Sequence, residues 1–552
     1  MLPFLLIFLL PCAFSTLTFE PGSLDGTLFS SVGLTDKQLA IFSWLEGLVY
    51  EAESTGGWPD VYKTNETGNL ATQRGMPSYR YSLAFTGYAA TAKAITHTPM
   101  HTKPTFDLLS TIFNLMVREE VYSYWGQKGD CAPFFLTTYC EKYNTSMCDL
   151  DEAWHGKDAT RCPDPVYFGN IMYSGHLAHI GALVHLFART PDEAEEALKF
   201  KVGTTDYTLD SLVSRLVFQA EGQRDVLGGG ITCEPANVYP SCQSHLHASL
   251  RLLATEDSAK ESRFSAIRKN WQEYLLLDNI AKGWDSPVGS TPFGERIFEI
   301  AQQTPRHPSI PDFGIPIGCA SHDVWVLAYL RSWALDNADT PAPDPSYVLA
   351  RGRELLKNHT GWKDGQLQDE RCKVLSGEEN WDVASAMYPV VEAAVSDGDF
   401  EKSNEAILRF EKQSGSGVNT MWYTSEFGLD VFVTTQLAMS FVMDNTTMVD
   451  LHGAAGVKKL ARIKGEGYIN EVEGDVFVRR AKKGDKALDV TLVAAGEGGE
   501  EVRVRIGGLN EVEGLNATVN GQKVSLSFEG EELVVEGHVK NGVDTNFIVT
   551  WT

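Results

Sequence analysis

The sequence has few positively charged residues for its size. Its 552 residues include 47 lysines and arginines against 73 aspartates and glutamates, which gives a formal net charge of −26 at pH 7. An acidic surface repels phosphate backbones and anionic lipids, so neither nucleic-acid binding nor adhesion to membranes is expected. Hydrophobic residues make up 43% and charged residues 22%, a balance that excludes a mainly disordered or fibrous chain. Neutral or apolar small molecules and neutral glycans remain the natural ligands.

Long hydrophobic runs are also missing. No stretch reaches the roughly 18 uninterrupted apolar residues that a membrane-spanning helix needs. Residues 2–14 are almost wholly apolar, and Ala13-Phe14-Ser15 supplies small residues at the spacing that signal peptidase recognises. We therefore expect a signal peptide over residues 1–15, a secreted protein, and no membrane segment after cleavage. The alternative is a buried N-terminal helix.

Secretion also predicts glycans and disulfide bridges. N-x-S/T sequons place the expected glycans at Asn65, Asn144, Asn358, Asn445 and Asn516. Cysteine is scarce, with nine residues, of which Cys12 would leave with the signal peptide. Four others crowd a loop-like stretch and are expected to form structural bridges of open connectivity: Cys131, Cys140, Cys148 and Cys162. Cys319 and Cys372 would be buried thiols or a pair.

Hydrophobic periodicity divides the chain in two. From about residue 34 to 443 the period is helical, beginning with a helix that Thr35-Asp36 can cap. Further helices are expected at 81–95, 106–117, 171–188, 209–221, 242–254, 262–277, 322–334, 346–357, 382–396, 400–412 and 428–442. Strand-rich stretches are missing here, which excludes an α/β sheet enzyme. So many helices suggest a toroid of alternating inner and outer helices, assigned to residues 20–445.

After about residue 460 the period changes to two. Val502, Val504 and Ile506 alternate with arginines, and the apolar residues at 524, 526 and 528 alternate with other residues. Asn520-Gly521 and Asn541-Gly542 supply turn signals between such runs. We expect a β-sandwich-like antiparallel domain over residues 455–552. Because it has one histidine and no cysteine, we assign it a structural or lid-like role, with weak glycan binding left open.

Two segments of the helical region carry candidate chemistry. In the first, a loop ends at Asn170, which can cap a helix carrying His176 and His179. Met172 is four residues before His176 and shares its helix face. In the second segment, residues 228–243, a loop of glycines and prolines presents two cysteines just before a helix opens.

Three interpretations of these segments compete. Cys233 and Cys242 could form one more disulfide, as is usual outside the cell, with His176 a satisfied core residue. A zinc site is conceivable, although the nine-residue cysteine spacing matches no common pattern; its ligands would be His176, His179, Cys233, Cys242 and His245. The third is an acid–base site that joins an imidazole titrating near neutral pH to two tunable thiols.

The two motifs together resemble the linalool dehydratase/isomerase family. They read Asn170-Ile-Met-Tyr-x-Gly-His-Leu and Cys233-Glu-Pro-x-Asn-x-x-x-x-Cys242. Residues 81–85, 307–333 and 425–442 are similar to the same family, so the resemblance covers about residues 35–443 and not the β domain.

This resemblance implies an (α/α)6 barrel that adds or removes water on an allylic terpene alcohol, with isomerisation and without a cofactor or metal. His176, Cys233 and Cys242 match the catalytic His and two Cys of the family. Met172 and Tyr239 fall at positions that line its substrate pocket. The expected partner is thus a small apolar alcohol or alkene, and a homo-oligomer is left open.

The first helix departs from the family pattern. An ungapped alignment puts the catalytic Asp of the family at Ser54 and its Tyr at Asp60. Only after a small shift does Glu51 or Glu53 take the place of the Asp and Tyr62 that of the Tyr. Glu53 and Tyr62 are counted as catalytic candidates. If Cys233 and Cys242 are acid and base, they must be thiols, and the prolines between them, which restrict φ, are expected to disfavour a relaxed bridge.

Two other functions stay open at this point. A secreted helical toroid with a β domain also fits a carbohydrate-active enzyme, whose carboxylate pair would come from Asp312, Glu379 and Asp382. The second open function is that of a family member that only binds or cyclises a metabolite. It stays open because the catalytic acid of the first helix is displaced from its place in the family pattern.

Overall fold

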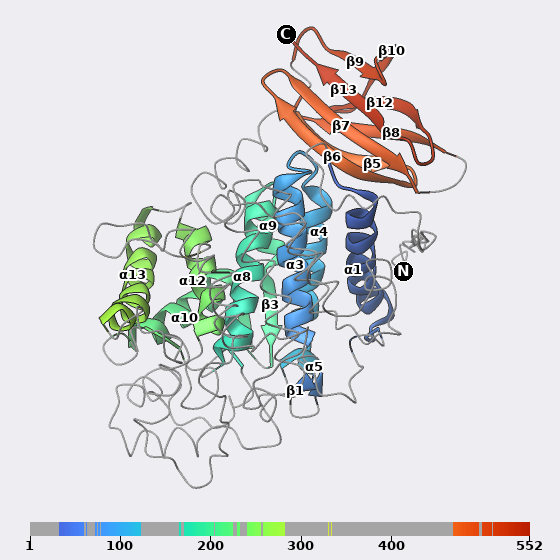
Figure 1. Ribbon diagram of the computed structural model, residues 1–552. Helices are drawn as coiled ribbons and strands as arrows, with labels where there is room; N and C mark the ends of the chain where they lie inside the picture. Colours follow the sequence, from blue (N-terminus) through green and yellow to red (C-terminus); the bar gives the residue numbers. More distant parts are fainter. Residues whose placement is uncertain are drawn as a thin grey trace, which may run out of the picture.

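The protein, seen here as a computed structural model, has helices in its N-terminal part and a C-terminal body of strands (Figure 1). The structure describes residues 33–59, 62, 72–73, 76–77, 79–122, 165–166, 170–203, 205–222, 224, 229–231, 240–254, 258–281, 329, 333, 467–495, 499–509 and 512–552. The expected signal peptide, four of the five sequons, and the cysteines other than Cys242 lie outside these residues. The helices expected after residue 281 also do, apart from Tyr329 and Trp333, which are helical.

The predicted helices up to residue 281 are present at nearly the predicted bounds. They are α1 Asp36–Thr55, α3 Tyr79–Thr96, α4 Lys103–Met116, α8 Ile171–Phe187, α10 Leu209–Gly222, α12 Pro240–Ala254 and α13 Ser258–Ala281. Four short strands and two short helices were not predicted: β1 Thr72–Gln73, β2 Met76–Pro77, α5 Glu119–Tyr122, α9 Pro191–Ala197, β3 Lys199–Val202 and β4 Thr205–Thr208. Among the described residues, none of the helices combines the length and apolarity that crossing a bilayer requires.

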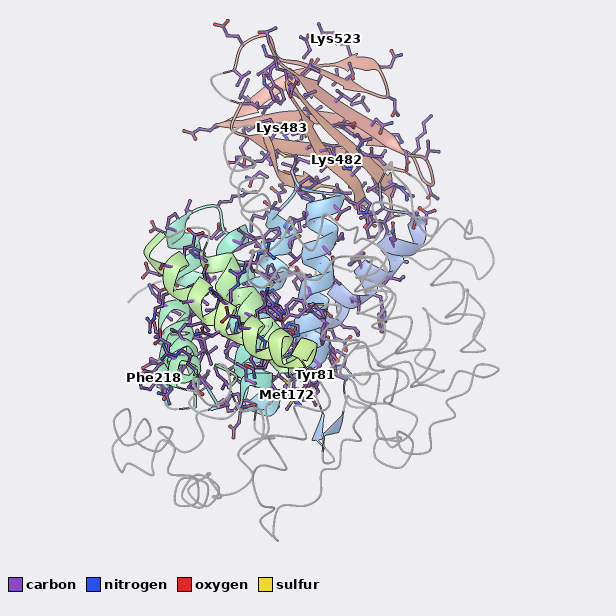
Figure 2. The ribbon with its side chains drawn as sticks, turned by 60° about the vertical axis from the view of Figure 1, so that its left-hand side comes forward. Tyr81, Met172, Phe218, Lys482, Lys483 and Lys523 are labelled. Carbon is purple, nitrogen blue, oxygen red and sulfur yellow. The ribbon has the colours of Figure 1, made fainter. Side chains whose placement is uncertain are left out.

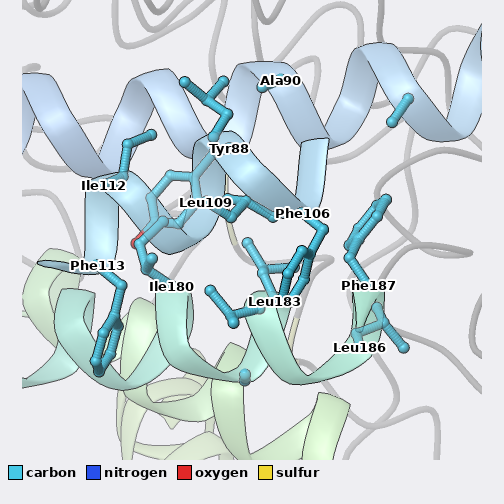
Figure 3. Packing of buried hydrophobic residues seen from close by; sticks show 14 of the residues in the cluster. Tyr88, Ala90, Phe106, Leu109, Ile112, Phe113, Ile180, Leu183, Leu186 and Phe187 are labelled. Carbon is cyan, nitrogen blue, oxygen red and sulfur yellow. The ribbon is translucent and has the colours of Figure 1, made fainter. Parts of the chain in front are cut away.

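Helix α8 lies at the centre of the described helices. It packs against α3, α4, α10 and α12, and all of its residues except His185 are buried, as expected of a core helix. Two glycines permit the close approach. A Cβ on Gly87 of α3 would lie 2.6 Å from Cδ1 of Ile180, and one on Gly181 would lie 2.9 Å from Cδ1 of Leu209. Figure 3 shows apolar side chains filling the space between α3, α4 and α8.

The C-terminal part is the expected antiparallel β domain. Its strands are β5 Tyr468–Glu473, β6 Val476–Gly484, β7 Ala487–Ala494, β8 Glu500–Gly507, β9 Asn516–Val519, β10 Gln522–Val524, β11 Leu526–Glu529, β12 Glu532–Val539 and β13 Thr545–Thr550. They form two sheets, with the orders β10-β9-β13-β7-β6 and β11-β12-β8-β5. The sheets face each other, since a Cβ on Gly537 of β12 would lie 2.8 Å from the ring of Phe547 in β13.

The predicted alternation is confirmed in β8 and in the last strand, β13, but not in the run at residues 524–528. Val502, Val504 and Ile506 are buried at 1% exposure. At the run after the Asn520-Gly521 turn, however, the chain leaves one sheet as β10 and enters the other as β11. Phe528 in β11 is 49% exposed, because β11 is an edge strand that pairs with β12 alone.

Backbone hydrogen bonds join the helical part to the outer strands of both sheets. The Leu34 amide donates to the Arg479 carbonyl at 2.9 Å, and the Met100 amide donates to the Ala481 carbonyl at 3.2 Å, both in β6. The Ile469 amide of β5 donates to the Met100 carbonyl at 2.8 Å. Open strand edges are a liability that proteins cover. The β domain is therefore bonded into the molecule, which fits the structural role and not the lid.

Candidate active site

Helix α8 carries His176 one turn after Met172, and both side chains are buried, with 1% and 4% exposure. Residues four apart share a helix face, as predicted. The helix begins where expected, with Asn170 at the predicted N-cap position, but the Asn170 side chain makes no capping hydrogen bond. The backbone of Asn170, at φ −134° and ψ 48°, is outside the extended conformation that a capping residue uses. Its carbonyl instead accepts the Ser174 hydroxyl at 2.9 Å.

Three aromatic side chains on one face of α3 surround His176. The Tyr88 hydroxyl lies 2.8 Å from Nδ1 of His176. The rings of Tyr81 and Phe85 stand edge-on to the imidazole, with centroids 5.6 Å and 5.4 Å away. Residues 81–85 resemble the dehydratase/isomerase family, but a role for Tyr88 was not predicted. The signal was present, because aromatic residues at 81, 85 and 88 follow the i, i+4, i+7 spacing of a single helix face.

Two more histidines lie directly behind His176. Nδ1 of His179 is 3.3 Å from Nδ1 of His245, which α12 supplies. The His245 ring is 3.9 Å from the His176 ring and stacks on Tyr88 at 5.1 Å with an interplanar angle of 8°. Tyr329 closes the group at 4.8 Å from His245. Together, Tyr88, His176, His179 and His245 form a group that we call the His–Tyr cluster.

Burial keeps two members of this cluster, His176 and Tyr88, uncharged near neutral pH. Burial lowers the pKa of His176 well below its ordinary value, and the charges of His179 and Arg80 lower it further. Burial raises the pKa of Tyr88 well above its ordinary value, with a smaller contribution from Tyr329. A neutral imidazole therefore faces a neutral phenol, and each of the two groups can transfer or share a proton without first losing a charge.

A buried cation holds the thioether of Met172. Nη2 of Arg80, a residue with 0% exposure, donates to Sδ of Met172 at 3.4 Å, and its guanidinium lies 4.5 Å from the centre of the Tyr81 ring. The Tyr81 hydroxyl also donates to this sulfur, and Figure 2 shows Tyr81 and Met172 side by side. The position predicted to line a substrate pocket is thus fixed by two side chains of α3.

The backbone of Cys242 lies beside Gly175, the residue before His176, where α12 packs on α8. The Cys242 side chain is 5% exposed, and a Cβ on Gly175 would lie 3.3 Å from the Cys242 carbonyl oxygen. Cys233 and Tyr239 lie outside the described residues, and so do the carboxylates Asp312, Glu379 and Asp382. In the part of the chain that the structure describes, no group of three or more His, Cys, Asp or Glu side chains is placed to hold a metal ion. The redox state of the two cysteines stays a prediction.

The structure puts the two first-helix candidates in another environment. The Glu53 carboxylate is 47% exposed and pairs with Arg118 at 3.0 Å. Tyr62 is buried at 2% exposure against Trp58 and Tyr79, whose rings stack 4.0 Å apart. None of the described contacts brings Glu53 or Tyr62 to His176. Of the expected glycan sites, Asn516 is exposed at the start of β9.

Comparison with known proteins confirms the resemblance over part of the helical region. Residues 148–283 match the family model of linalool dehydratase/isomerase. A similar solved structure is the crystal structure of Ara127N-Se, a GH127 β-L-arabinofuranosidase from Geobacillus stearothermophilus T6. It shares 11% sequence identity over 94% of this chain and 80% of that chain, with a TM-score of 0.23. No curated protein matches the chain.

Proposed function

We propose that this chain is a cofactor-free hydro-lyase/isomerase that dehydrates, hydrates or isomerises an apolar, allylic, terpenoid-like alcohol. One observation carries the proposal: a buried, neutral His176 lies inside the segment that matches the dehydratase/isomerase family. Aromatic faces attract cations. The rings of Tyr81 and Phe85 beside His176 therefore suit an allylic cation that has to be kept from water.

The reaction needs an acid and a base on either side of this cation. One group protonates the leaving hydroxyl, and a neutral base removes a proton from the neighbouring carbon or, in the reverse direction, activates water. We assign these roles to Cys233, Cys242 and His176, and contact with the hydrocarbon to Met172 and Tyr239. We leave Glu53 and Tyr62 out, because Glu53 is half exposed and paired with an arginine, and Tyr62 is packed among aromatic rings.

The test is turnover of a panel of allylic alcohols, followed by mass. Loss of one water would show dehydration, and an unchanged mass with a new retention time would show isomerisation or cyclisation. His176→Ala and Cys242→Ser should each reduce turnover at least about tenfold, a bound set below the roughly 10²–10⁴-fold of a positioned proton transfer because the alcohols are surrogate substrates. His185→Ala is the control, since His185 lies at the other end of α8 and is partly exposed. Full activity in both site variants would overturn the proposal.

The architecture and the compartment belong to the same proposal. An (α/α)6 toroid over residues 20–445 is supported by the run of long helices around α8 and by the family match. Secretion is supported by the apolar N-terminal stretch and the sequons. Expression in a eukaryotic secretory host should give a product in the medium that lacks residues 1–15 and loses mass on glycan removal. An intracellular product with an intact N-terminus would contradict secretion.

A further inference from the structure

We propose that Tyr88 fixes His176 in the tautomer with its proton on Nε2, so that His176 meets the substrate as a hydrogen-bond donor and not as the base. The catalytic meaning of this inference rests on the proposed function. The tautomer itself does not, because it follows from the hydrogen bonds of the His–Tyr cluster. Tyr88 is then a positioning residue that acts through His176.

The donors and acceptors available at Tyr88 and His176 determine the direction of the hydrogen bond between them. Tyr88 is 2% exposed, and in the described structure the partner of its hydroxyl is Nδ1 of His176 at 2.8 Å. A buried O–H that donates to no acceptor costs free energy, so its hydrogen points at the available nitrogen. A neutral imidazole has one donor and one acceptor nitrogen. If Nδ1 accepts from Tyr88, the proton of His176 is on Nε2.

The charge states make the opposite arrangement unfavourable. Burial keeps the phenol of Tyr88 protonated and the imidazole of His176 neutral. The charged and titratable groups that contribute to these pKa values are Arg80, His179 and Tyr329. If the proton were on Nδ1, this nitrogen could not accept the hydrogen of the Tyr88 hydroxyl. The hydroxyl would keep its proton, because burial raises its pKa, and would have to turn that hydrogen away from Nδ1.

Packing holds the Tyr88 hydroxyl in place. One face of its ring stacks on His245, 5.1 Å away and nearly parallel, and the ring also contacts His179 at 4.4 Å. Phe85 stands edge-on at 5.5 Å and 90°. A ring in contact with three neighbours has little freedom to reorient, so the hydroxyl is set before substrate arrives. Preorganised donors of this kind stabilise charge that develops on an oxygen.

This tautomer limits His176 to donating a hydrogen bond and leaves the role of the base to another residue. A neutral imidazole with its proton on Nε2 and Nδ1 engaged by Tyr88 cannot take a second proton through Nε2. It can donate a hydrogen bond to the hydroxyl that leaves, or to the water that adds. Proton removal from carbon then falls to another group, for which Cys242 on the neighbouring helix, reacting as its thiolate, is the candidate.

The direct measurement is the 15N spectrum of the imidazole. Protein labelled with 15N-histidine is examined by magic-angle-spinning NMR, and the His176 signals are assigned by their loss in His176→Gln. The wild type should show a protonated Nε2 and a hydrogen-bonded, unprotonated Nδ1. In Tyr88→Phe the Nδ1 signal should lose its hydrogen-bond shift. Tyr173→Phe is the matched control, since Tyr173 is also buried and donates to a backbone carbonyl, that of Met116, at 3.0 Å.

Kinetics provide the second arm. Tyr88→Phe should lower kcat about five- to tenfold, the effect of one lost hydrogen bond, with KM nearly unchanged. The control variant should keep both constants. His176→Gln places an amide N–H donor near the position of Nε2–H and should retain more activity than His176→Ala. Equal loss in these two variants would show that His176 is a base and would overturn the inference.

The two arms separate the possible failures. A wild-type spectrum with the proton on Nδ1, or identical His176 spectra in wild type and Tyr88→Phe, overturns the role of Tyr88 whatever the substrate. The predicted spectrum in a protein that turns over none of the allylic alcohols upholds the tautomer and contradicts the proposed function.

Discussion

Arg479 provides a quantitative test of how the β domain is attached. It lies in β6 with its side chain 12% exposed. Its Nη1 donates to the Leu34 carbonyl at 2.7 Å, and its other nitrogens form ion pairs with Asp36 and, at 2.7 Å, with Asp544. Burial lowers the pKa of Arg479 and Asp544 partly offsets this, so the group stays cationic at neutral pH. Arg479→Ala removes all three interactions at once.

The magnitude follows from the exposure of each partner. A hydrogen bond from a charged donor to a carbonyl contributes about 1.5–3 kcal/mol when the acceptor is left without its donor. The two aspartates are 49% and 56% exposed, so each ion pair adds at most about 0.5 kcal/mol after screening by solvent. The expected loss is about 2–4 kcal/mol. Arg480→Ala, on the neighbouring residue, breaks a partly exposed pair with Asp489 and should cost under about 1 kcal/mol.

Amide hydrogen exchange measures this loss of stability at the junction itself. The Leu34 and Met100 amides, which donate to β6, should exchange about 30- to 700-fold faster in Arg479→Ala, the factor that corresponds to 2–4 kcal/mol of local opening. Amides in the middle of α8 should change little. If Arg479→Ala and Arg480→Ala accelerate the two amides equally, the side chain does not fix the junction and the reasoning is refuted.

Three further expectations concern stability. Thr35→Ala removes the capping box of α1 and should lower the free energy of unfolding by about 1 kcal/mol, whereas Thr35→Ser should be nearly neutral in the same urea titration. In α1, a Cβ on Gly47 meets nothing within 4 Å, so Gly47→Ala should stabilise by about 0.5–1 kcal/mol. A Cβ on Gly181 meets three core side chains within 4 Å, so Gly181→Ala should destabilise by about 1–3 kcal/mol, and equal effects of the two variants would contradict the packing. Burial, with a contribution from Arg268, lowers the pKa of His247 to about 3. Because the unfolded histidine takes up its proton near pH 6.5, stability should fall by up to about 1.4 kcal/mol per unit as pH drops from 6.5 towards 3. His247→Phe should remove this one contribution and leave those of His101 and His176, whose pKa values burial also lowers. An unchanged pH dependence would count against it.

Local patterns predicted the helices well. The bounds of α8 and α10 differ from the predicted ones by at most one residue, and the largest differences are four residues at each end of α13. These helices have strong periodicity and clear start or stop signals, which are properties of neighbouring residues. The buried positions of β8 followed from its alternation for the same reason.

The candidate site was predictable only in part, because its contacts are not local. His176 and Met172 could be identified from a motif and helix spacing. The bond from Tyr88 to His176 spans 88 residues and that from His179 to His245 spans 66, and no period in the sequence encodes which helix faces which. The same reason explains the missed hydrogen bonds between the helical part and the sheet edges.

The junction between helices and sheets has a consequence for biosynthesis. The Arg479 side chain and the Leu34 carbonyl that it binds are 445 residues apart. At the usual 5–20 residues per second, about 20–90 s pass between the synthesis of the two partners. During that time the backbone amides and carbonyls of residues 33–34 and of the segment that follows α3 cannot pair with β6, because β6 has not yet been synthesised. On a polysome, the completed β6 of a leading chain competes for the same groups of the chain behind it. Correct pairing within one molecule then depends on the spacing of ribosomes as well as on how strongly β6 binds its own helical part.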